Sequence, residues 1–178
     1  MPDLTTPLGP GDHVDGPSDA PLELVMYGDF QCPFCAGAQP ILRRVRDRLA
    51  GRLRFAFRHF PLEELHPDAR RAAEASEAAG AQDAFWSMHD ALYANRGRLG
   101  LEDVAGLARG LGLDADRVRA ELASGAHARR VERDIESGRA AGVDGTPTFF
   151  VGGRRHRGAF DAQSLIAALE NSGDSSPA

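Results

Sequence analysis

The first clear pattern in the sequence is a compact apolar run at residues 22–27. Glu23 is its only charge, and a Gly-Asp pair follows it, so we predict a mostly buried strand that ends at residue 28. Residues 1–20, by contrast, are rich in Pro, Gly and Asp. This composition predicts a loose arm, with at most a short edge strand at residues 13–15.

The pattern changes to a helical one from Pro33. Apolar residues fall on one face, and Gly51 is placed to cap the end of the helix; the face is formed by Ile41, Leu42, Val45 and Leu49. Residues 52–58 then alternate between arginine and apolar residues, which predicts a strand with one apolar face. Together these segments predict a strand, helix, strand unit.

A long helical stretch separates this unit from the next strand. It contains an alanine-rich segment at residues 67–79, several further apolar sets at helical spacing, and an N-cap candidate at Asp114. Because the pattern over about 80 consecutive residues indicates helices and no strands, we expect a helical subdomain inserted into an α/β core.

Strand patterning returns at residues 148–151. Gly152-Gly153 predicts a hairpin turn leading into residues 154–158, and a final helix is expected from Asp161 to about residue 170. The predicted organisation is a flexible arm (1–11), the first half of the core (12–61), the helical subdomain (62–142), the second half of the core (143–170) and a disordered tail (171–178).

Composition narrows the class of protein. The chain has 178 residues and a formal charge of -5, and its 21 basic residues, all arginine, are scattered among acids, which argues against a nucleic-acid partner. No apolar run approaches the roughly 20 residues that span a bilayer, so membrane insertion is not expected. The N-terminus has no basic cluster or apolar core, which predicts a cytoplasmic location if Met1 is the native start.

Two cysteines are the strongest chemical feature. Cys32 and Cys35 lie three positions apart, where the buried strand ends and the helix begins. A helix N-terminus favours an anion, so the Cys32 thiol should ionise readily and act as a nucleophile. Cys35, one helical turn further, can resolve the mixed disulfide that forms, and Pro33 suits the first turn of a helix.

Two other interpretations of the cysteine pair stay open. The pair could supply half of a zinc site, but histidines or a second subunit would have to complete it. It could also be two inert core thiols. His59, His66 and His89 fit no zinc spacing and are expected to be structural, so no metal site is predicted; Phe85, Trp86 and Met88 at helical spacing are expected in the core.

A proline directly before the third strand is a second candidate feature. Gly145-Thr146-Pro147-Thr148 invites a cis peptide bond, although most X-Pro bonds in folded proteins are trans. From sequence physics alone, this proline is weak evidence.

Together, these motifs resemble the DsbA-like branch of the thioredoxin superfamily. The resemblance rests on residues 30–35 (FQCPFC) and 142–151 (GVDGTPTFFV), extends through 58–62, His66-Pro67 and Phe85-Trp86, and covers approximately residues 12–170. It implies an α/β, thioredoxin-like fold with an inserted all-helical subdomain.

The resemblance also implies roles for individual residues. Cys32 would attack and Cys35 resolve, with Pro33 and Phe34 shaping the site between them. Pro147 would be a cis-proline packed beside the cysteines. Thr146 would offer its backbone to an extended substrate peptide, so binding would depend little on substrate sequence. No cofactor beyond the redox-active disulfide is implied.

The chain departs from the family pattern at two positions. Relatives commonly have an acidic residue six positions before the first cysteine, where this chain has Met26. Asp29 or Glu23 could relay the proton of Cys35 instead, although Asp29 equally suits a turn or helix cap. Phe34 replaces the histidine of the strongest oxidants, which leaves the direction of electron transfer open.

The function predicted from the sequence is a thiol-disulfide oxidoreductase. Its partners would be protein or peptide substrates with disulfides or thiols, and an unidentified redox partner or low-molecular-weight thiol. Two alternatives remain: a binding module on the same fold, chaperone-like or a metal carrier, and a glutathione-dependent transferase or isomerase. Enzymes of the last kind typically lack the second cysteine, so Cys35 counts against that alternative.

Overall fold

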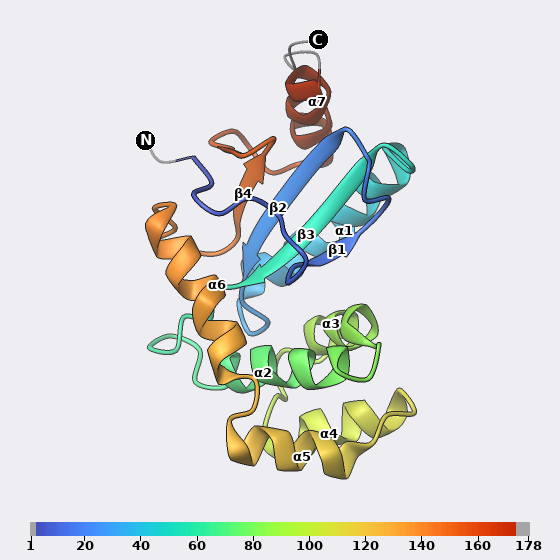
Figure 1. Ribbon diagram of the computed structural model, residues 1–178, viewed down its shortest axis with the longest axis vertical. Coiled ribbons are helices and arrows are strands. Elements are labelled where there is room, and N and C mark those ends of the chain that lie inside the picture. The colour runs from blue at the N-terminus through green and yellow to red at the C-terminus, as the bar shows by residue number, and fades with distance from the viewer. Residues whose placement is uncertain (1–2, 174–178) are drawn as a thin grey trace. The chain divides into compact units, whose positions relative to one another are not determined.

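The computed structural model describes residues 3–173 and shows an α/β protein (Figure 1). The described residues form two compact units. The sheet unit comprises residues 3–28, 37–58 and 137–173, and the helical unit comprises residues 29–36 and 59–136. The two units are interleaved along the chain. The predicted α/β class with a helical insertion is confirmed.

The sheet has five strands in the order β1-β3-β2-β4-β5. Their bounds are β1 (His13–Asp15), β2 (Leu22–Gly28), β3 (Leu53–His59), β4 (Thr148–Val151) and β5 (Arg154–Arg155). β4 runs antiparallel to β2, with Met26 opposite Phe149. β5 is only two residues long, so the second strand of the predicted hairpin is shorter than expected.

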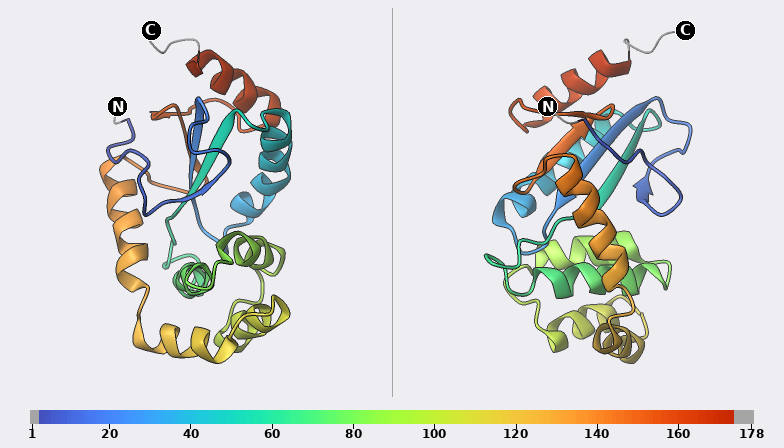
Figure 2. Two further views of the ribbon diagram at one scale, coloured as in Figure 1. Left: turned by 45° about the vertical axis from the view of Figure 1, so that its right-hand side comes forward. Right: turned by 60° about the vertical axis from the view of Figure 1, so that its left-hand side comes forward.

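Two helices of the sheet unit lie side by side on one face of the sheet: α1 (Pro33–Arg48) and α7 (Ala162–Gly173) (Figure 2). Leu165 and Leu169 of α7 are fully buried, and α7 packs on β2 and β4. α7 continues three residues beyond its predicted end, into the predicted disordered tail. The rest of that tail, residues 174–178, lies outside the described residues, as do residues 1–2 of the predicted arm.

β3 corrects one expectation from the sequence. Its arginines were expected on a polar face, but Arg58 is buried, with 2% of its surface exposed. β3 lies between β1 and β2 in the sheet. The Arg58 guanidinium donates hydrogen bonds to the Asp12 carboxylate, the Thr6 and Pro7 carbonyls and the Tyr27 hydroxyl. Burial alone would lower the pKa of Arg58, but the hydrogen bonds to Asp12 and Tyr27 raise it above its usual value.

The helical unit contains four complete helices that pack against one another. They are α2 (Ala69–Gly80), α3 (Phe85–Ala94), α4 (Leu101–Gly110) and α5 (Ala115–Ser124), followed by the start of α6 (Ala128–Ala140). Asp114 caps α5 as predicted, since its carboxylate accepts a hydrogen bond from the Arg117 amide. Phe85 and Met88 are buried, as expected, whereas Trp86 is only partly buried.

A buried charged network supports the helical unit. The His59 ring bonds the Glu77 carboxylate at 2.7 Å, and the His59 amide donates to Asp134 at 2.9 Å. Arg130 in turn pairs with Asp134. Buried charges are tolerated when paired in this way, so the network joins the end of β3 to helices α2 and α6.

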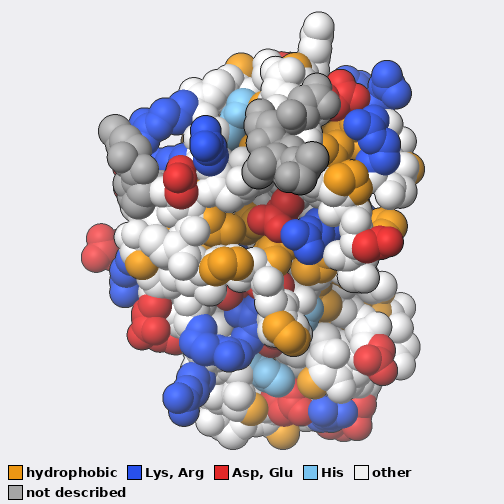
Figure 3. All heavy atoms as spheres, turned by 45° about the horizontal axis from the view of Figure 1, so that its top comes forward, with side chains coloured by type: hydrophobic (Ala, Val, Ile, Leu, Met, Phe, Trp, Pro, Cys, Tyr) orange, Lys and Arg blue, Asp and Glu red, His pale blue; other side chains and the backbone are white. Residues whose placement is uncertain are grey.

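The surface carries intermixed charges. On the face in Figure 3, arginine and acidic side chains alternate over short distances. Ion pairs among the described residues include Arg119 with Glu102 and Arg117 with Glu121. Among residues 3–173, no helix combines the length and the apolar character needed to span a bilayer.

Candidate functional site

The cysteine pair occupies the first turn of α1. Cys32 directly precedes the helix, and its carbonyl accepts the first helical hydrogen bond, from Ala36, at 3.1 Å. A side chain at this N-cap position faces the backbone amides of the first helical turn. The first turn contains no acidic residue. The helix start therefore favours a thiolate at Cys32.

The two cysteines differ in their exposure to solvent. Both are present as thiols; Cys32 keeps 3% of its surface exposed, whereas Cys35 is fully enclosed. A substrate disulfide can therefore reach Cys32 first. Cys35 lies three residues further along α1, one turn beneath it. This difference agrees with attack by Cys32 and resolution by Cys35.

The residues between the cysteines face solvent. Pro33 is the first residue of α1 and is exposed. Phe34 is 67% exposed, among the largest exposures of any bulky apolar side chain in the described residues. An exposed aromatic ring beside a reactive sulfur is suited to contact an apolar part of a substrate.

Asp29 organises the approach to the cysteines. Its side chain is fully buried and accepts three hydrogen bonds, from the Gln31 amide (2.7 Å), the Leu62 amide (2.9 Å) and the His66 ring (2.7 Å). The bond to Gln31 is the turn contact that the sequence suggested. The other two tie the segment before Cys32 to the loop that follows β3.

Tyr93, which the sequence analysis did not single out, also belongs to this site. It is 6% exposed, and its ring packs against Phe30, two residues before Cys32, with 4.9 Å between the ring centroids. Burial, followed by the neighbouring Cys35, Asp29 and Cys32, raises the pKa of Tyr93 well above its usual value. The only hint in the sequence was its position eight residues after Phe85, on the apolar face of the same helix.

Thr146 and Pro147 belong to the sheet unit. The Thr146–Pro147 peptide bond is cis, as the family resemblance implied. Directly after it, β4 begins at Thr148, whose hydroxyl donates to the Gly145 carbonyl at 2.7 Å. Pro147 is partly buried, and both Thr146 and Pro147 precede a strand that pairs with β2.

The positions considered for proton relay have distinct surroundings. Met26 is fully buried on β2 and carries no ionisable group. Glu23 pairs with Arg54 at 2.9 Å. Of the two acids proposed to replace Met26, only Asp29 lies in the same unit as the cysteines. A relay through Asp29 stays a prediction.

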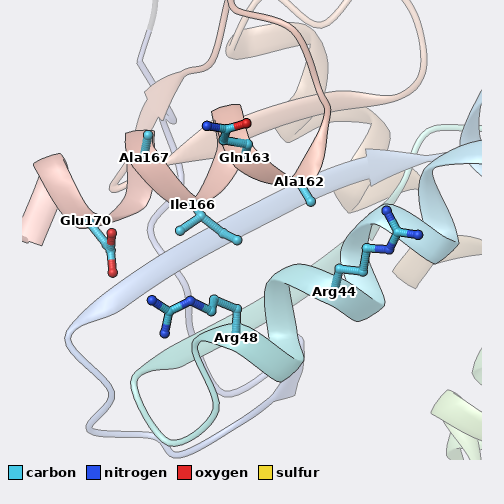
Figure 4. Close-up of a pocket in the computed structure, with 7 residues that line it drawn as sticks. All are labelled: Arg44, Arg48, Ala162, Gln163, Ile166, Ala167 and Glu170. Carbon is cyan, nitrogen blue, oxygen red and sulfur yellow. The ribbon is translucent and has the colours of Figure 1, made fainter.

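Helices α1 and α7 enclose a separate, open groove of about 520 Å³ (Figure 4). Ile166 points from α7 towards α1, and the two arginines come from successive turns of α1. The lining residues are Arg44, Arg48, Ala162, Gln163, Ile166, Ala167 and Glu170. None of them is a cysteine or a histidine, so the groove offers no redox chemistry.

The histidines at positions 59, 66 and 89 hydrogen-bond to carboxylates. His59 contacts Glu77, His66 contacts Asp29, and His89 contacts Asp90 at 2.8 Å, which agrees with structural roles. Within residues 3–173, no three or more His, Cys, Asp or Glu side chains are arranged to hold a metal ion. The chemistry that the described site offers is that of a dithiol.

Comparison with known proteins identifies the family. The sequence profile described as Thioredoxin matches residues 9–171. The chain therefore belongs to the thioredoxin family, and its fold is that of the DsbA-like members.

Two solved structures illustrate this likeness. BdbD from Bacillus subtilis has a TM-score of 0.85 at 23% identity, over 92% of this chain and 94% of that one. DsbA2 from Pseudomonas aeruginosa has a TM-score of 0.74 at 28% identity, over 92% of this chain and 96% of that one. The inserted helices are thus part of the shared fold.

The curated relatives are much longer proteins. One, from Salinispora arenicola, is named as the Na(+)/H(+) antiporter NhaA 1 and is 47% identical over 168 residues. The match covers 94% of this chain but 26% of that protein. The chain thus spans about a quarter of the length of the curated relatives it matches.

Proposed function

We propose that this protein is a thiol-disulfide oxidoreductase that exchanges disulfides with protein or small-thiol substrates through Cys32 and Cys35. The observation that carries the proposal is the placement of both thiols on the first turn of α1, with Cys32 at the N-cap and Cys35 enclosed beneath it. Membership of the thioredoxin family and the DsbA-like fold support the same chemistry.

The reaction follows from the order of access. The Cys32 thiolate attacks one sulfur of a substrate disulfide, so a Cys32–substrate bond forms and the other substrate sulfur leaves as a thiolate. The Cys35 thiolate then attacks the Cys32 sulfur and releases the first substrate sulfur. The substrate is reduced by two electrons, and the protein ends with a Cys32–Cys35 disulfide. The reverse sequence oxidises a substrate dithiol.

Substrates would be recognised mainly through their backbone. The main chain at Thr146, beside the cis peptide bond, would pair with an extended peptide as an added strand does. Such pairing depends little on sequence, which suits an enzyme for many proteins. A redox partner or a small thiol would reset the cysteine pair, and we propose that this occurs in the cytoplasm.

The test is to equilibrate the purified protein with glutathione redox buffers and to follow the Cys32–Cys35 disulfide by thiol trapping and mass spectrometry. A reduction potential near that of thioredoxin, about -270 mV, would indicate a cytoplasmic reductant. One near that of DsbA, about -120 mV, would indicate an oxidant and contradict the cytoplasmic location. If no reversible disulfide forms at any potential, the proposed function is wrong.

The variant Cys35→Ser tests whether Cys35 resolves the mixed disulfide. It should stop the reaction at a mixed disulfide on Cys32, because no second thiol can resolve it. Unchanged turnover in Cys35→Ser would instead favour a glutathione-dependent transferase.

A further inference from the structure

His66 is bonded to the turn that precedes Cys32. Its ring lies 2.7 Å from the buried Asp29 carboxylate, which also accepts the Gln31 amide at 2.7 Å and the Leu62 amide at 2.9 Å. Because two backbone amides already donate to this carboxylate, it acts as an acceptor, and the proton of the third bond is on Nδ1 of the ring. Asp29 lies three residues before Cys32, so the ring is attached to the start of the cysteine segment.

The same loop binds this turn a second time. The side-chain oxygen of Gln31, directly before Cys32, accepts a hydrogen bond from the Asp68 amide at 2.9 Å. The Cys32 amide donates to the Asp29 carbonyl at 3.2 Å, which closes the turn 29–32. All of these groups lie in the helical unit. The segment His66-Pro67-Asp68 is thus bonded to the first residue of the turn and to the residue next to the reactive cysteine.

The loop that carries His66 is ordered by its own backbone. The Leu65 and His66 amides both donate to the Leu62 carbonyl, at 2.9 and 2.8 Å. The His66 carbonyl accepts the Ala69 amide at 3.1 Å, at the start of α2, and α2 packs against α3, α4 and α5. The ring therefore projects from a backbone that is fixed to the packed helices of its unit.

The position of the turn 29–32 matters because Cys32 is the N-cap of α1. The stabilisation that a helix start gives to an anion falls off within the first turn. It therefore depends on where the sulfur lies relative to the first helical amides, and the turn before the helix sets that position.

We propose that His66 is a positioning residue for disulfide exchange, whose hydrogen bond to Asp29 holds the turn that places the Cys32 sulfur at the start of α1. The proposal rests on the proposed function of the cysteine pair. His66 acts through Asp29 and takes no part in the exchange of sulfur bonds. Its contribution is to keep the attacking thiolate where the helix stabilises it.

The measurement is the rate at which Cys32 is alkylated by iodoacetamide as the pH is varied. The Cys32 thiolate attacks the carbon that bears the iodine, a sulfur–carbon bond forms and iodide leaves. Since the thiolate and not the thiol is the nucleophile, the midpoint of the rate against pH reports the ionisation of Cys32. Mass spectrometry assigns the label to Cys32 or Cys35, and circular dichroism shows whether each variant is folded.

His66→Leu keeps a side chain of similar size and removes the donor. We expect the midpoint to rise by about half a unit to one unit, because the turn no longer holds the sulfur at the helix start. The reduction potential of the cysteine pair in glutathione buffers should fall with it, since the thiolate exists only in the reduced form.

His66→Asn and His66→Gln test whether the hydrogen bond is the cause. The amide nitrogen of asparagine can occupy the place of ring Nδ1, so His66→Asn should return the midpoint close to the wild-type value. The amide nitrogen of glutamine lies nearer the place of Nε2, so His66→Gln should raise the midpoint. The Asn and Gln variants both keep a polar side chain, and they decide the question if His66→Leu does not fold.

His127→Leu is the matched control. His127 belongs to the same unit, its side chain is 19% exposed against 18% for His66, and its ring bonds the Glu121 carboxylate at the same distance of 2.7 Å. Glu121 lies on α5, far along the chain from the cysteines. Loss of this bond should lower the free energy of unfolding but leave the midpoint for Cys32 unchanged.

The inference is overturned if folded His66→Leu and His66→Gln keep the wild-type midpoint. It is also overturned if His66→Asn or His127→Leu raises the midpoint as far as His66→Leu does. If the wild-type protein forms no reversible Cys32–Cys35 disulfide in glutathione buffers, the proposed function fails instead. The alkylation midpoints then still decide whether His66 positions the Cys32 sulfur.

Discussion

Phe34 lies between the two cysteines, exposed at the start of α1. A charge at this position acts on Cys32 only when that sulfur is ionised, which requires the reduced form. We predict that Phe34→His raises the reduction potential of the Cys32–Cys35 pair by about 30 mV or more below pH 6.5, where the imidazole is cationic. Equilibration with glutathione buffers at pH 6 and pH 8 measures this change.

Phe34→Gln is the control for this prediction, since it introduces a polar but uncharged side chain. Its potential should stay within a few millivolts of the Phe34→His value at pH 8, and below that value at pH 6. Equal reduction potentials for the two variants at both pH values would show that a charge at position 34 does not stabilise the Cys32 thiolate.

Asp29 is the second residue whose role can be isolated. Its removal leaves the Leu62 and Gln31 amides and the His66 ring, which are partly buried, without their acceptor. We predict that Asp29→Ala lowers the free energy of unfolding by about 2–3 kcal/mol, measured by urea titration. Asp47→Ala, at an exposed position of α1, should change it by less than about 0.5 kcal/mol. A similar decrease in the free energy of unfolding for both variants would contradict the role of Asp29 in holding the segment before Cys32 to the loop that follows β3.

At the scale of an element, α7 depends on its N-cap. Asp161 accepts hydrogen bonds from the Ser164 amide at 2.9 Å and from the Ser164 hydroxyl at 2.7 Å. The backbone hydrogen bond, followed by the hydroxyl, holds the pKa of Asp161 below its usual value. A carboxylate with a lowered pKa stabilises the folded state above its unfolded pKa, and this stabilisation disappears as the pH falls through the folded pKa.

The prediction for α7 compares the wild-type protein with Asp161→Asn, which can still cap the helix but has no charge. The wild-type protein should have the higher melting temperature at pH 7, and the difference should shrink as the pH falls below about 4 and vanish once Asp161 is protonated in the folded state. Thermal unfolding followed by circular dichroism at both pH values provides the measurement. A difference that is as large at about pH 2 as at pH 7 would show that the charge is not the cause.

Most elements followed directly from local patterns. The helical period predicted α2 to α6, and the Asp114 cap is where the sequence placed it. β3 was the exception, because its arginines suggested one polar face. A strand in the middle of a sheet can be covered on both faces. The alternation of polar and apolar residues along the strand does not show which segments cover the second face.

At the scale of the whole molecule, charge determines how copies of the chain interact. The formal charge is -5 at pH 7 and the isoelectric point is about 5.7. We predict that solubility is lowest near the isoelectric point and rises towards pH 7.5, because net charge keeps molecules apart. Light scattering at one protein concentration across this range tests the prediction, and a minimum well away from the isoelectric point would contradict it.

The sequence by itself determined the fold class, the helical insertion and the reactive cysteine pair. Each depends on information that is local in the chain: the period of apolar residues, and two thiols at the junction of a strand and a helix. The proposed order of attack also rests on this junction, because a helix start favours an anion at its first residue.

Only the tertiary structure decided which distant groups meet. Arg58 is buried because Asp12, Tyr27 and two carbonyls satisfy its guanidinium, and Tyr93 packs against the distant ring of Phe30. The type of a residue does not identify its partner when that partner is 31 or 46 positions away, as for Arg58 with Tyr27 and Asp12. The burial of a polar side chain and its hydrogen bonds depend on that partner, so they are decided only when the chain has folded.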